Sequence, residues 1–169
     1  QRALDQTFQE VALQHLPVRV CMDRAGYVGG DGSAMHGFMD ITMNRVFPDV
    51  AILAASDEPN FKAALEFMRT YETSASFIRY PRDKVPAKPL LATVPPYELG
   101  KALLMRPAKG KTPALTILAY GSQVYLAADA INDLDVQGYD IALYDARFAK
   151  PVDIDLLEEL VAAGQTILT

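Results

Sequence analysis

A glycine-rich segment at residues 23–37 holds the side chains with the clearest potential for chemistry. It reads DRAGYVGGDG over residues 23–32 and follows an apolar stretch at 18–22. Glycines let a backbone approach a ligand closely, and the Arg24 guanidinium offers a planar fork for a phosphate or carboxylate. Asp31 would be its fixed negative partner. The glycines fit neither a Walker P-loop nor a dinucleotide fingerprint, so a ligand-binding loop and an ordinary surface loop with an ion pair remain equally open.

A second candidate lies at residues 79–82, where Arg79 and Arg82 flank Tyr80 and Pro81. Proline forces an extended exit from the preceding apolar stretch, which keeps both arginines near its carboxyl end. Together with Arg24 they could clamp an anion. The spacing alone leaves open whether they bind a ligand or are solvated charges at a strand end.

The chain has two histidines, His15 and His36. His15 falls near the end of a predicted helix, where a cation suits the helix dipole, so we interpret it as structural. His36 lies five residues after Asp31, and a histidine beside a carboxylate can move protons near neutral pH. Arg2 is one helical turn before Asp5, which suggests an exposed pair. No cysteine–histidine cluster indicates zinc, and no serine elbow indicates a hydrolase.

These candidates need a scaffold that brings strand ends together, and the first half of the chain predicts one. β-branched and apolar stretches predict strands at 18–22, 50–55 and 76–80, and helical spacing predicts helices at 2–15, 37–45 and 58–71. Ser56 is the expected cap of the third helix. Strands that alternate with helices predict a parallel α/β sheet, in which ligands bind outside the carboxyl ends of the strands.

The second half begins with residues 81–113, in which seven prolines and scattered lysines predict a linker over the surface. One short strand is expected within it, near 99–105. The α/β rhythm then resumes with strands at 115–120, 141–144 and 165–169 and helices at 122–134 and 153–163.

Composition excludes several classes of protein. The chain has 169 residues, of which 50% are hydrophobic and 22% charged, with a net charge of −5. A negative balance argues against nucleic acid, and no apolar run approaches the roughly 20 residues that span a bilayer. The single Cys21 excludes an internal disulfide and suits a reducing compartment.

Five short motifs occur in one known family in the same order. They read QRALDQ at residues 1–6, DRAGYVGGDG at 23–32, SDE at 56–58, IRYPR at 78–82 and DARFAKP at 145–151. Through them nearly the whole chain resembles the family of 1-deoxy-D-xylulose-5-phosphate synthases. Related transketolases and the β-subunits of 2-oxo-acid dehydrogenases share the fold but not this set of motifs.

The resemblance implies a transketolase-like α/β fold in two parts. Residues 1–80 are expected to form the latter part of a pyrimidine-binding domain, 81–113 a linker, and 114–169 the first part of a C-terminal domain. The chain is therefore expected to be an internal fragment, inactive alone, that exposes apolar surface when it is separated from its other domains.

The resemblance also implies the chemistry. The full protein would use thiamine diphosphate and Mg²⁺, held mainly by parts outside this chain, to join pyruvate to glyceraldehyde 3-phosphate with loss of CO2, a step toward isoprenoids, thiamine and pyridoxal. Arg24 and Arg79 would hold the acceptor's phosphate, Arg2 would line the pocket, and Asp31 would lie by the reacting carbon atoms. His36 is the expected catalytic substitute for the family's histidine, through a small shift of the loop, unless this branch has altered or lost that step. A homodimer in the bacterial cytoplasm or plastid stroma is implied, neither secreted nor bound to nucleic acid or membrane.

Two residues depart from the family's pattern. Met35 falls where the family has its active-site histidine, one position before His36, and Asp83 replaces a glycine after RYPR. A methionine cannot transfer a proton. Three alternatives therefore stay open: a transketolase-like enzyme with a different acceptor, a catalytically silent paralogue that acts as a binding subunit, and two structural domains without a ligand.

Overall fold

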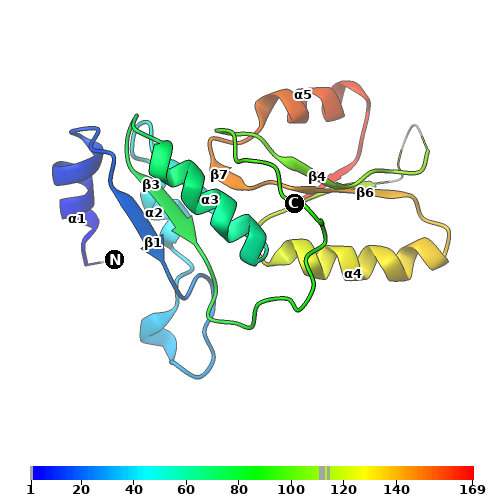
Figure 1. The fold of residues 1–169 in the computed structure, drawn as a ribbon, viewed down its shortest axis with the longest axis horizontal. Helices are drawn as coiled ribbons and strands as arrows, with labels where there is room; N and C mark the ends of the chain where they lie inside the picture. Colours follow the sequence, from blue (N-terminus) through cyan, green and yellow to red (C-terminus); the bar gives the residue numbers. More distant parts are fainter. Residues whose placement is uncertain (1, 111–112, 114) are drawn as a thin grey trace.

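Two four-stranded sheets lie side by side in the computed structural model, which describes residues 2–110, 113 and 115–169 (Figure 1). The first sheet has the order β1-β3-β2-β7 and the second the order β4-β6-β5-β8. The strands of the first are β1 (Arg19–Met22), β2 (Ala51–Ala54), β3 (Ser76–Arg79) and β7 (Phe148–Lys150). Those of the second are β4 (Leu103–Arg106), β5 (Leu115–Ala119), β6 (Ile141–Asp145) and β8 (Ile167–Leu168). The predicted α/β class is confirmed.

Most strands pair in parallel, as the alternation of strands and helices predicts. β3 lies between β1 and β2 in parallel register, and β5 lies between β6 and β8 in the same way. The exceptions are β4 and β7, which are antiparallel edge strands. The carboxyl ends of β1, β2 and β3 therefore share one edge of the first sheet, where the loop that begins at residue 23 also starts.

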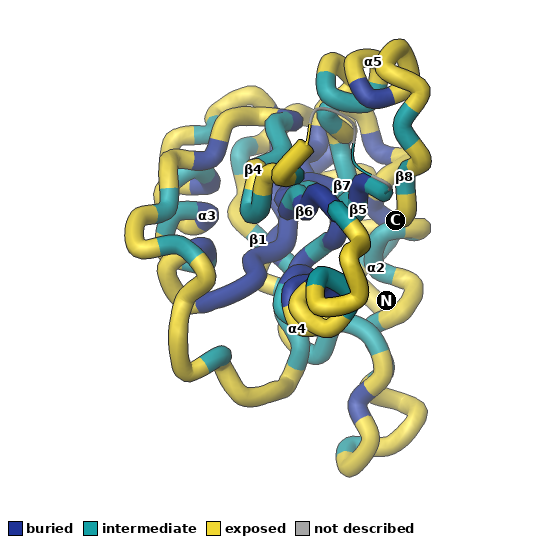
Figure 2. Tube along the Cα trace, turned by 90° about the vertical axis from the view of Figure 1, so that its right-hand side faces the viewer, coloured by how far each residue is buried: buried dark blue, intermediate teal, exposed yellow. Residues whose placement is uncertain are grey.

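Helices cover both faces of the first sheet. α3 (Glu58–Thr70) buries Ala64 and Met68 against Leu53 and Ile78. The opposite face is covered by the N-terminal helical segment and by the turn before β2, through a cluster that includes Ala12, Phe47, Ile52 and Phe77. Figure 2 shows these buried strands in dark blue beneath helices whose outer faces are exposed. Burial of apolar area on both faces stabilises the sheet.

The N-terminal helix is shorter than predicted and changes its winding. It runs as α1 (Leu4–Gln6) and continues as the π-helical η1 (Thr7–Ala12). The backbone N–H of Leu13 donates to the Phe8 carbonyl at 2.9 Å, five residues earlier. His15 follows, with Nδ1 3.6 Å from an Asp49 carboxylate oxygen, on the exposed surface.

Two further helices are short. The 3-10 turn η2 (Ser33–Met35) lies within the glycine-rich loop, and α2 (Asp40–Asn44) follows the loop. α3 is capped by Asp57 and not by the predicted Ser56, because the Asp57 carboxylate accepts a hydrogen bond from the Asn60 N–H at 2.9 Å. The acceptor oxygen at this position satisfies one of the free N–H groups of the first turn.

The second sheet is covered by α4 (Gln123–Val136) on one face and by α5 (Ile154–Ala162) on the other side (Figure 1). α4 buries Val124 and Ile131 against Ile141 and Leu143 of β6. α4 has 14 residues, and no helix in the described part of the chain is long and apolar enough to cross a bilayer.

The first and second halves of the chain share a sheet, whereas a linker that only crosses the surface would leave them as separate units. β7 was not predicted; it lies in the second half of the sequence but pairs with β2 of the first sheet. Phe148 of β7 is 1% exposed and packs edge-to-face against Phe67 and Tyr97. Tyr97 itself is buried, which corrects the interpretation of residues 81–113 as a segment that only crosses the surface.

Candidate active site

The glycine-rich loop is fixed to the end of β3 by backbone hydrogen bonds. The Ala25 N–H donates to the Tyr80 carbonyl at 3.0 Å, and Gly26 and Gly37 exchange two bonds of 3.1 and 2.8 Å. A Cβ at Gly37 would lie 2.4 Å from the Arg24 carbonyl oxygen, so only glycine allows this approach. The loop therefore folds back on itself and presents its charged residues at the carboxyl edge of the sheet.

Asp31 links the glycine-rich loop to the segment that follows β3. Its carboxylate accepts a hydrogen bond from Arg24 Nε at 2.8 Å and forms a second ion pair with Arg82. The Arg24 side chain also pairs with the neighbouring Asp23. Hydrogen bonding to Arg24 holds the pKa of Asp31 below its ordinary value, with burial acting in the opposite direction. Asp31 is thus an ionised anchor and hydrogen-bond acceptor rather than a proton donor.

Arg79 ends β3 and lies close beneath the same loop. Its Nη2 donates to the Gly37 carbonyl at 3.1 Å, and its Nε lies 3.4 Å from an Asp40 carboxylate oxygen. The second contact is long for a charge-assisted bond, which normally measures about 2.7–2.9 Å. Arg24 and Arg79 thus flank the Gly26–Gly37 bridge, and no hydrogen bond between the described residues joins their side chains.

His36 is held by the backbone and not by a carboxylate. Its Nδ1 accepts a hydrogen bond from the Val28 N–H at 3.1 Å, and its ring meets the Tyr27 ring edge-on at 5.1 Å. Asp31, five residues earlier in the sequence, forms no hydrogen bond with His36 among the described residues. Because Nδ1 is an acceptor here, Nε2 is the nitrogen that can carry a proton.

The remaining predicted residues lie at the surface. Met35, at the position of the family's histidine, is 54% exposed, whereas the neighbouring His36 is half-buried. Arg2 is exposed at the start of the N-terminal helix, which packs on one face of the first sheet. The structure therefore brings Arg24, Asp31 and Arg79 to one edge and leaves the role of Arg2 a prediction.

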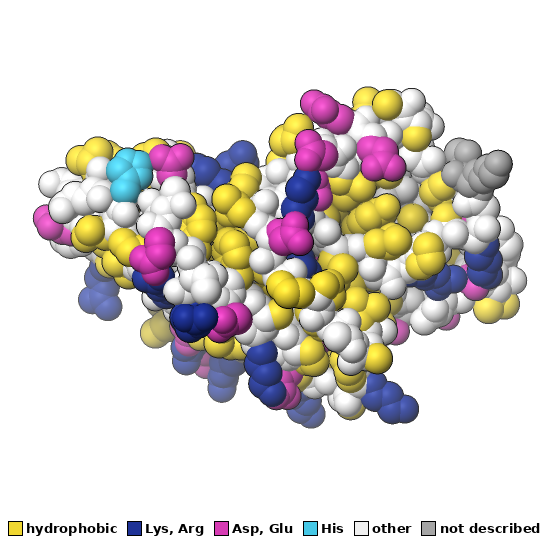
Figure 3. All heavy atoms as spheres, turned by 45° about the horizontal axis from the view of Figure 1, so that its top comes forward, with side chains coloured by type: hydrophobic (Ala, Val, Ile, Leu, Met, Phe, Trp, Pro, Cys, Tyr) yellow, Lys and Arg dark blue, Asp and Glu magenta, His cyan; other side chains and the backbone are white. Residues whose placement is uncertain are grey.

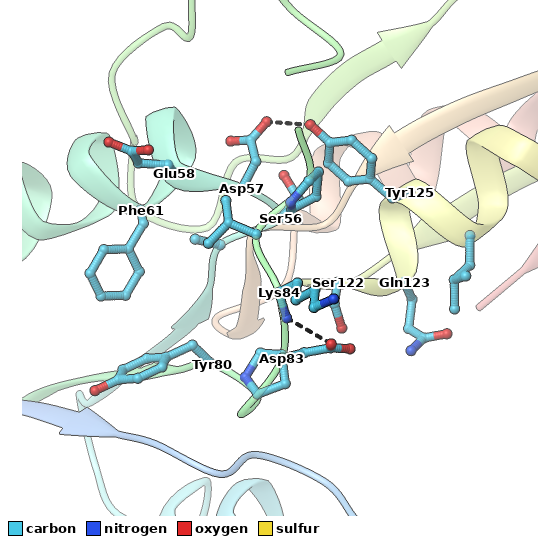
Figure 4. A pocket seen from close by; sticks show the side chains of 15 residues that line it. Ser56, Asp57, Glu58, Phe61, Tyr80, Asp83, Lys84, Ser122, Gln123 and Tyr125 are labelled. Carbon is cyan, nitrogen blue, oxygen red and sulfur yellow. Dashed lines mark hydrogen bonds between the residues drawn. The ribbon is translucent and has the colours of Figure 1, made fainter. Parts of the chain in front are cut away.

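Two cavities open at the boundary between the halves. The larger, about 540 Å³, lies between the first turns of α3 and α4 and the segment after β3. Figure 4 shows Tyr125 and Asp57 meeting across it, where the Tyr125 hydroxyl donates to the Asp57 carboxylate at 2.7 Å. Its walls are mainly apolar, and none of the predicted site residues lines it. The smaller cavity, about 230 Å³, is lined by Arg79.

A buried polar cluster lies behind these cavities, at the end of β6. Arg147 is 3% exposed, donates to the carbonyls of Pro95 and Pro96 at 3.1 Å each, and lies 4.1 Å above the centre of the Tyr97 ring. Its backbone N–H donates to the Asp145 carboxylate at 2.9 Å. Burial raises the pKa of Asp145 to about 6, although the Arg147 N–H opposes this change.

Asp145→Asn is expected to stabilise the full-length protein at pH 8 and to leave its stability at pH 4 unchanged. Between about pH 4 and 6 the folded state keeps a proton that the unfolded state has released, so stability falls as pH rises through this window, by at most about 3 kcal/mol. An asparagine does not titrate and removes that loss. Scanning calorimetry of parent and variant from pH 4 to 8 measures it; parallel Tm curves would contradict the expectation.

Sequence reasoning assigned no role to Asp40 or Tyr120, although both lie at this edge. Asp40 follows the glycine-rich loop and contacts Arg79. Tyr120 directly follows β5 and lines the smaller cavity. A polar residue at the carboxyl end of a parallel strand was the available signal for Tyr120, but the boundary between the halves could not be placed from the sequence.

Comparisons with known proteins define the class. The model of the transketolase pyrimidine binding domain matches residues 1–88, and that of the transketolase C-terminal domain matches residues 100–169. The chain therefore belongs to the transketolase family.

Within this class, the chain is similar to curated 1-deoxy-D-xylulose-5-phosphate synthases. The chain is 36% identical over 169 residues to the 1-deoxy-D-xylulose-5-phosphate synthase of Shewanella loihica, with 100% of the chain covered. It is 39% identical over 169 residues to the 1-deoxy-D-xylulose-5-phosphate synthase 1 of Geobacter metallireducens, with 99% covered. In both cases the chain spans 26% of the relative's length. The resemblance inferred from the motifs is confirmed.

Solved structures agree on the fold. A split-gene transketolase, described as an inactive beta4 tetramer, superposes with a TM-score of 0.82 over 98% of this chain and 51% of that chain, at 23% identity. A transketolase mutant from Pichia stipitis superposes with a TM-score of 0.66 over 82% of this chain and 20% of that chain, at 18% identity. At these identities the likeness concerns the fold alone.

Proposed function

We propose that the full-length protein is a thiamine-diphosphate-dependent transferase that condenses pyruvate with glyceraldehyde 3-phosphate to 1-deoxy-D-xylulose 5-phosphate, with loss of CO2. In this proposal the segment described here supplies the acceptor side of the site. The chain spans about a quarter of its relatives, so the donor side belongs to other parts of the protein, and the division at residues 80 and 114 is part of the proposal.

One observation supports the acceptor role most directly. The loop that starts after β1 is bonded to the end of β3, so that Arg24, Arg79 and Arg82 gather at the carboxyl edge of one parallel sheet. Guanidinium forks suit the geometry of a phosphate, and this edge is where open α/β sheets bind ligands. Because Asp31 and Asp40 already hold the arginines in place, the acceptor meets a preorganised site.

The cofactor and metal are proposed to bind outside this segment. Among residues 2–110, 113 and 115–169, no three histidine, cysteine or acidic side chains gather in a metal-binding arrangement. The acids of the loop are paired with arginine instead, so these residues do not fit a Mg²⁺ site. Thiamine diphosphate, when bound, supplies the electron sink that pyruvate needs to lose CO2.

The residues of this chain then orient the acceptor and move a proton. The arginines bind the phosphate end of the aldehyde. His36 Nε2 is the atom proposed to pass a proton to the aldehyde oxygen as the new carbon–carbon bond forms, because the Val28 N–H fixes Nδ1 as an acceptor. Water returns a proton to Nε2 in the same step, so the ring stays neutral. The ionised Asp31 accepts a hydrogen bond from a substrate hydroxyl and holds Arg24.

We also propose that the full protein is a homodimer of the bacterial cytoplasm or plastid stroma. The apolar side chains Leu13 and Val46 are 58% and 74% exposed, which supports the proposal that another domain or subunit covers them in the whole protein. Both acidic and basic side chains occur on the face in Figure 3, and the net charge is −5; we propose no nucleic-acid partner.

The test is an assay of the full-length protein loaded with thiamine diphosphate and Mg²⁺. Pyruvate and D-glyceraldehyde 3-phosphate are supplied together, and CO2 release and the phosphorylated product are followed by mass spectrometry. The proposal expects both products in equal amounts. Decarboxylation of pyruvate without the condensation product would indicate a different acceptor. A folded, cofactor-loaded protein that releases no CO2 would indicate a silent paralogue.

A further inference from the structure

The smaller cavity, of about 230 Å³, has walls from both halves of the chain. Arg79, Tyr80 and Pro81 line one side, together with the end of β2 and the start of the glycine-rich loop. Residues 120–123, between β5 and α4, line the other. A ligand in this cavity would therefore contact the second half as well as the predicted acceptor residues.

Tyr120 stands out in that wall because its hydroxyl is buried without a hydrogen-bond partner among the described residues. A buried hydroxyl that makes no bond costs stability, and such groups in native proteins call for an explanation. Burial raises the pKa of Tyr120, so the phenol stays neutral, and the nearby Arg79 guanidinium partly opposes this rise. The hydroxyl is thus a neutral group close to Arg79.

Arg79 has N–H donors that none of its described hydrogen bonds uses. Its described hydrogen bonds use Nε and one Nη2 hydrogen, and the Nε contact with Asp40 is long at 3.4 Å. A guanidinium has five N–H donors in a fixed plane. The side chain is only 12% exposed, so its remaining N–H groups face the protein interior and the cavity rather than bulk water.

We propose that Tyr120, from the second half of the chain, is a positioning residue for Arg79. When the acceptor is bound, its hydroxyl oxygen accepts a hydrogen bond from the guanidinium and holds the fork across the cavity, where the phosphate of the acceptor binds. The inference rests on the proposed function, since the phosphate is that of the acceptor. It would give the buried Tyr120 hydroxyl a hydrogen-bond partner, which the described residues of the free protein do not supply.

The test compares Tyr120→Phe with the parent in the full-length, cofactor-loaded protein. We expect KM for D-glyceraldehyde 3-phosphate to rise about five- to tenfold, the effect of one hydrogen bond, with kcat within about twofold. KM for pyruvate and kcat/KM for unphosphorylated D-glyceraldehyde stay at parental values. Tm stays equal or rises, because the lost hydroxyl made no bond in the free protein.

Tyr139→Phe is the matched control, since Tyr139 is 52% exposed in the turn before β6 and does not line the cavity. It should match the parent in every measurement. In an Arg79→Ala background, Tyr120→Phe should raise KM no further, because the donor of the hydrogen bond that it removes is already absent.

The outcomes separate the two proposals. A parent that makes no condensation product refutes the proposed function and this inference with it. An active parent whose Tyr120→Phe variant keeps the parental KM for the phosphorylated acceptor refutes the inference alone. Equal losses with both aldehydes, or a lower Tm with every constant changed, would make Tyr120 a structural residue and also overturn it.

Discussion

Replacing Arg79 with alanine in the full-length protein is expected to lower kcat/KM for D-glyceraldehyde 3-phosphate by about 100- to 1,000-fold, the effect of two charge-assisted hydrogen bonds to a phosphate. The same variant should change kcat/KM for unphosphorylated D-glyceraldehyde only a few-fold, since that aldehyde has no phosphate to bind. Initial rates with both aldehydes at saturating pyruvate measure the two effects.

A control variant and an alternative role for Arg79 show what this test can distinguish. Arg69→Ala removes an arginine from the exposed face of α3, where its side chain pairs with Glu66, and should leave both rates unchanged. Arg79 also donates to the Gly37 carbonyl, so its loss could loosen the loop. Equal losses with both aldehydes would assign Arg79 to holding the loop and would contradict phosphate binding.

Replacing His36 with alanine is expected to lower kcat by about 100- to 10,000-fold, the usual range for loss of a positioned acid or base. Met35→Ala should leave kcat within about threefold, because a thioether moves no proton. The pair tests which of two adjacent residues performs the step that the family assigns to a histidine. Steady-state rates of product formation, with the Tm of each variant as a check on folding, supply the measurement.

The opposite result would be equally informative. If His36→Ala keeps the parental kcat, another group moves the proton and the Val28–His36 bond only shapes the loop. If Met35→Ala abolishes activity, the loop must rearrange on substrate binding so that the exposed Met35 reaches the reacting atoms. Either finding would overturn the role proposed for His36 without affecting the phosphate site.

The strands and helices that follow a strong apolar period could be predicted from the sequence to within a few residues. β2, α3 and β3 are examples, since each contributes fully buried residues at regular spacing. The strand β7 could not be predicted. Residues 148–150 have no period of their own, and their pairing with β2 depends on the tertiary arrangement of the two halves.

The part of the site that could be predicted consists of residues that lie close together in one sequence motif and carry opposite charges. The ion pair between Arg24 and Asp31 follows from their place in one short loop, and it is confirmed by the 2.8 Å hydrogen bond. The partner of His36 could not be predicted, because sequence proximity to Asp31 does not show that the loop turns Nδ1 toward the Val28 N–H. Tyr120 was not identified from its place at the end of a strand, since it lines the same cavity as Arg79 only through the tertiary arrangement of the two halves.

The return of β7 into the first sheet bears on how this region can be divided or exchanged. A cut near residue 88, where the first family domain ends, would leave β2 as an open edge, with backbone groups free to pair with another chain. Recombination at that boundary would separate Phe148 from the core that it fills. The two domains are thus separate in sequence but share one sheet, and a chimaera that swaps only one of them would have to reproduce the missing strand.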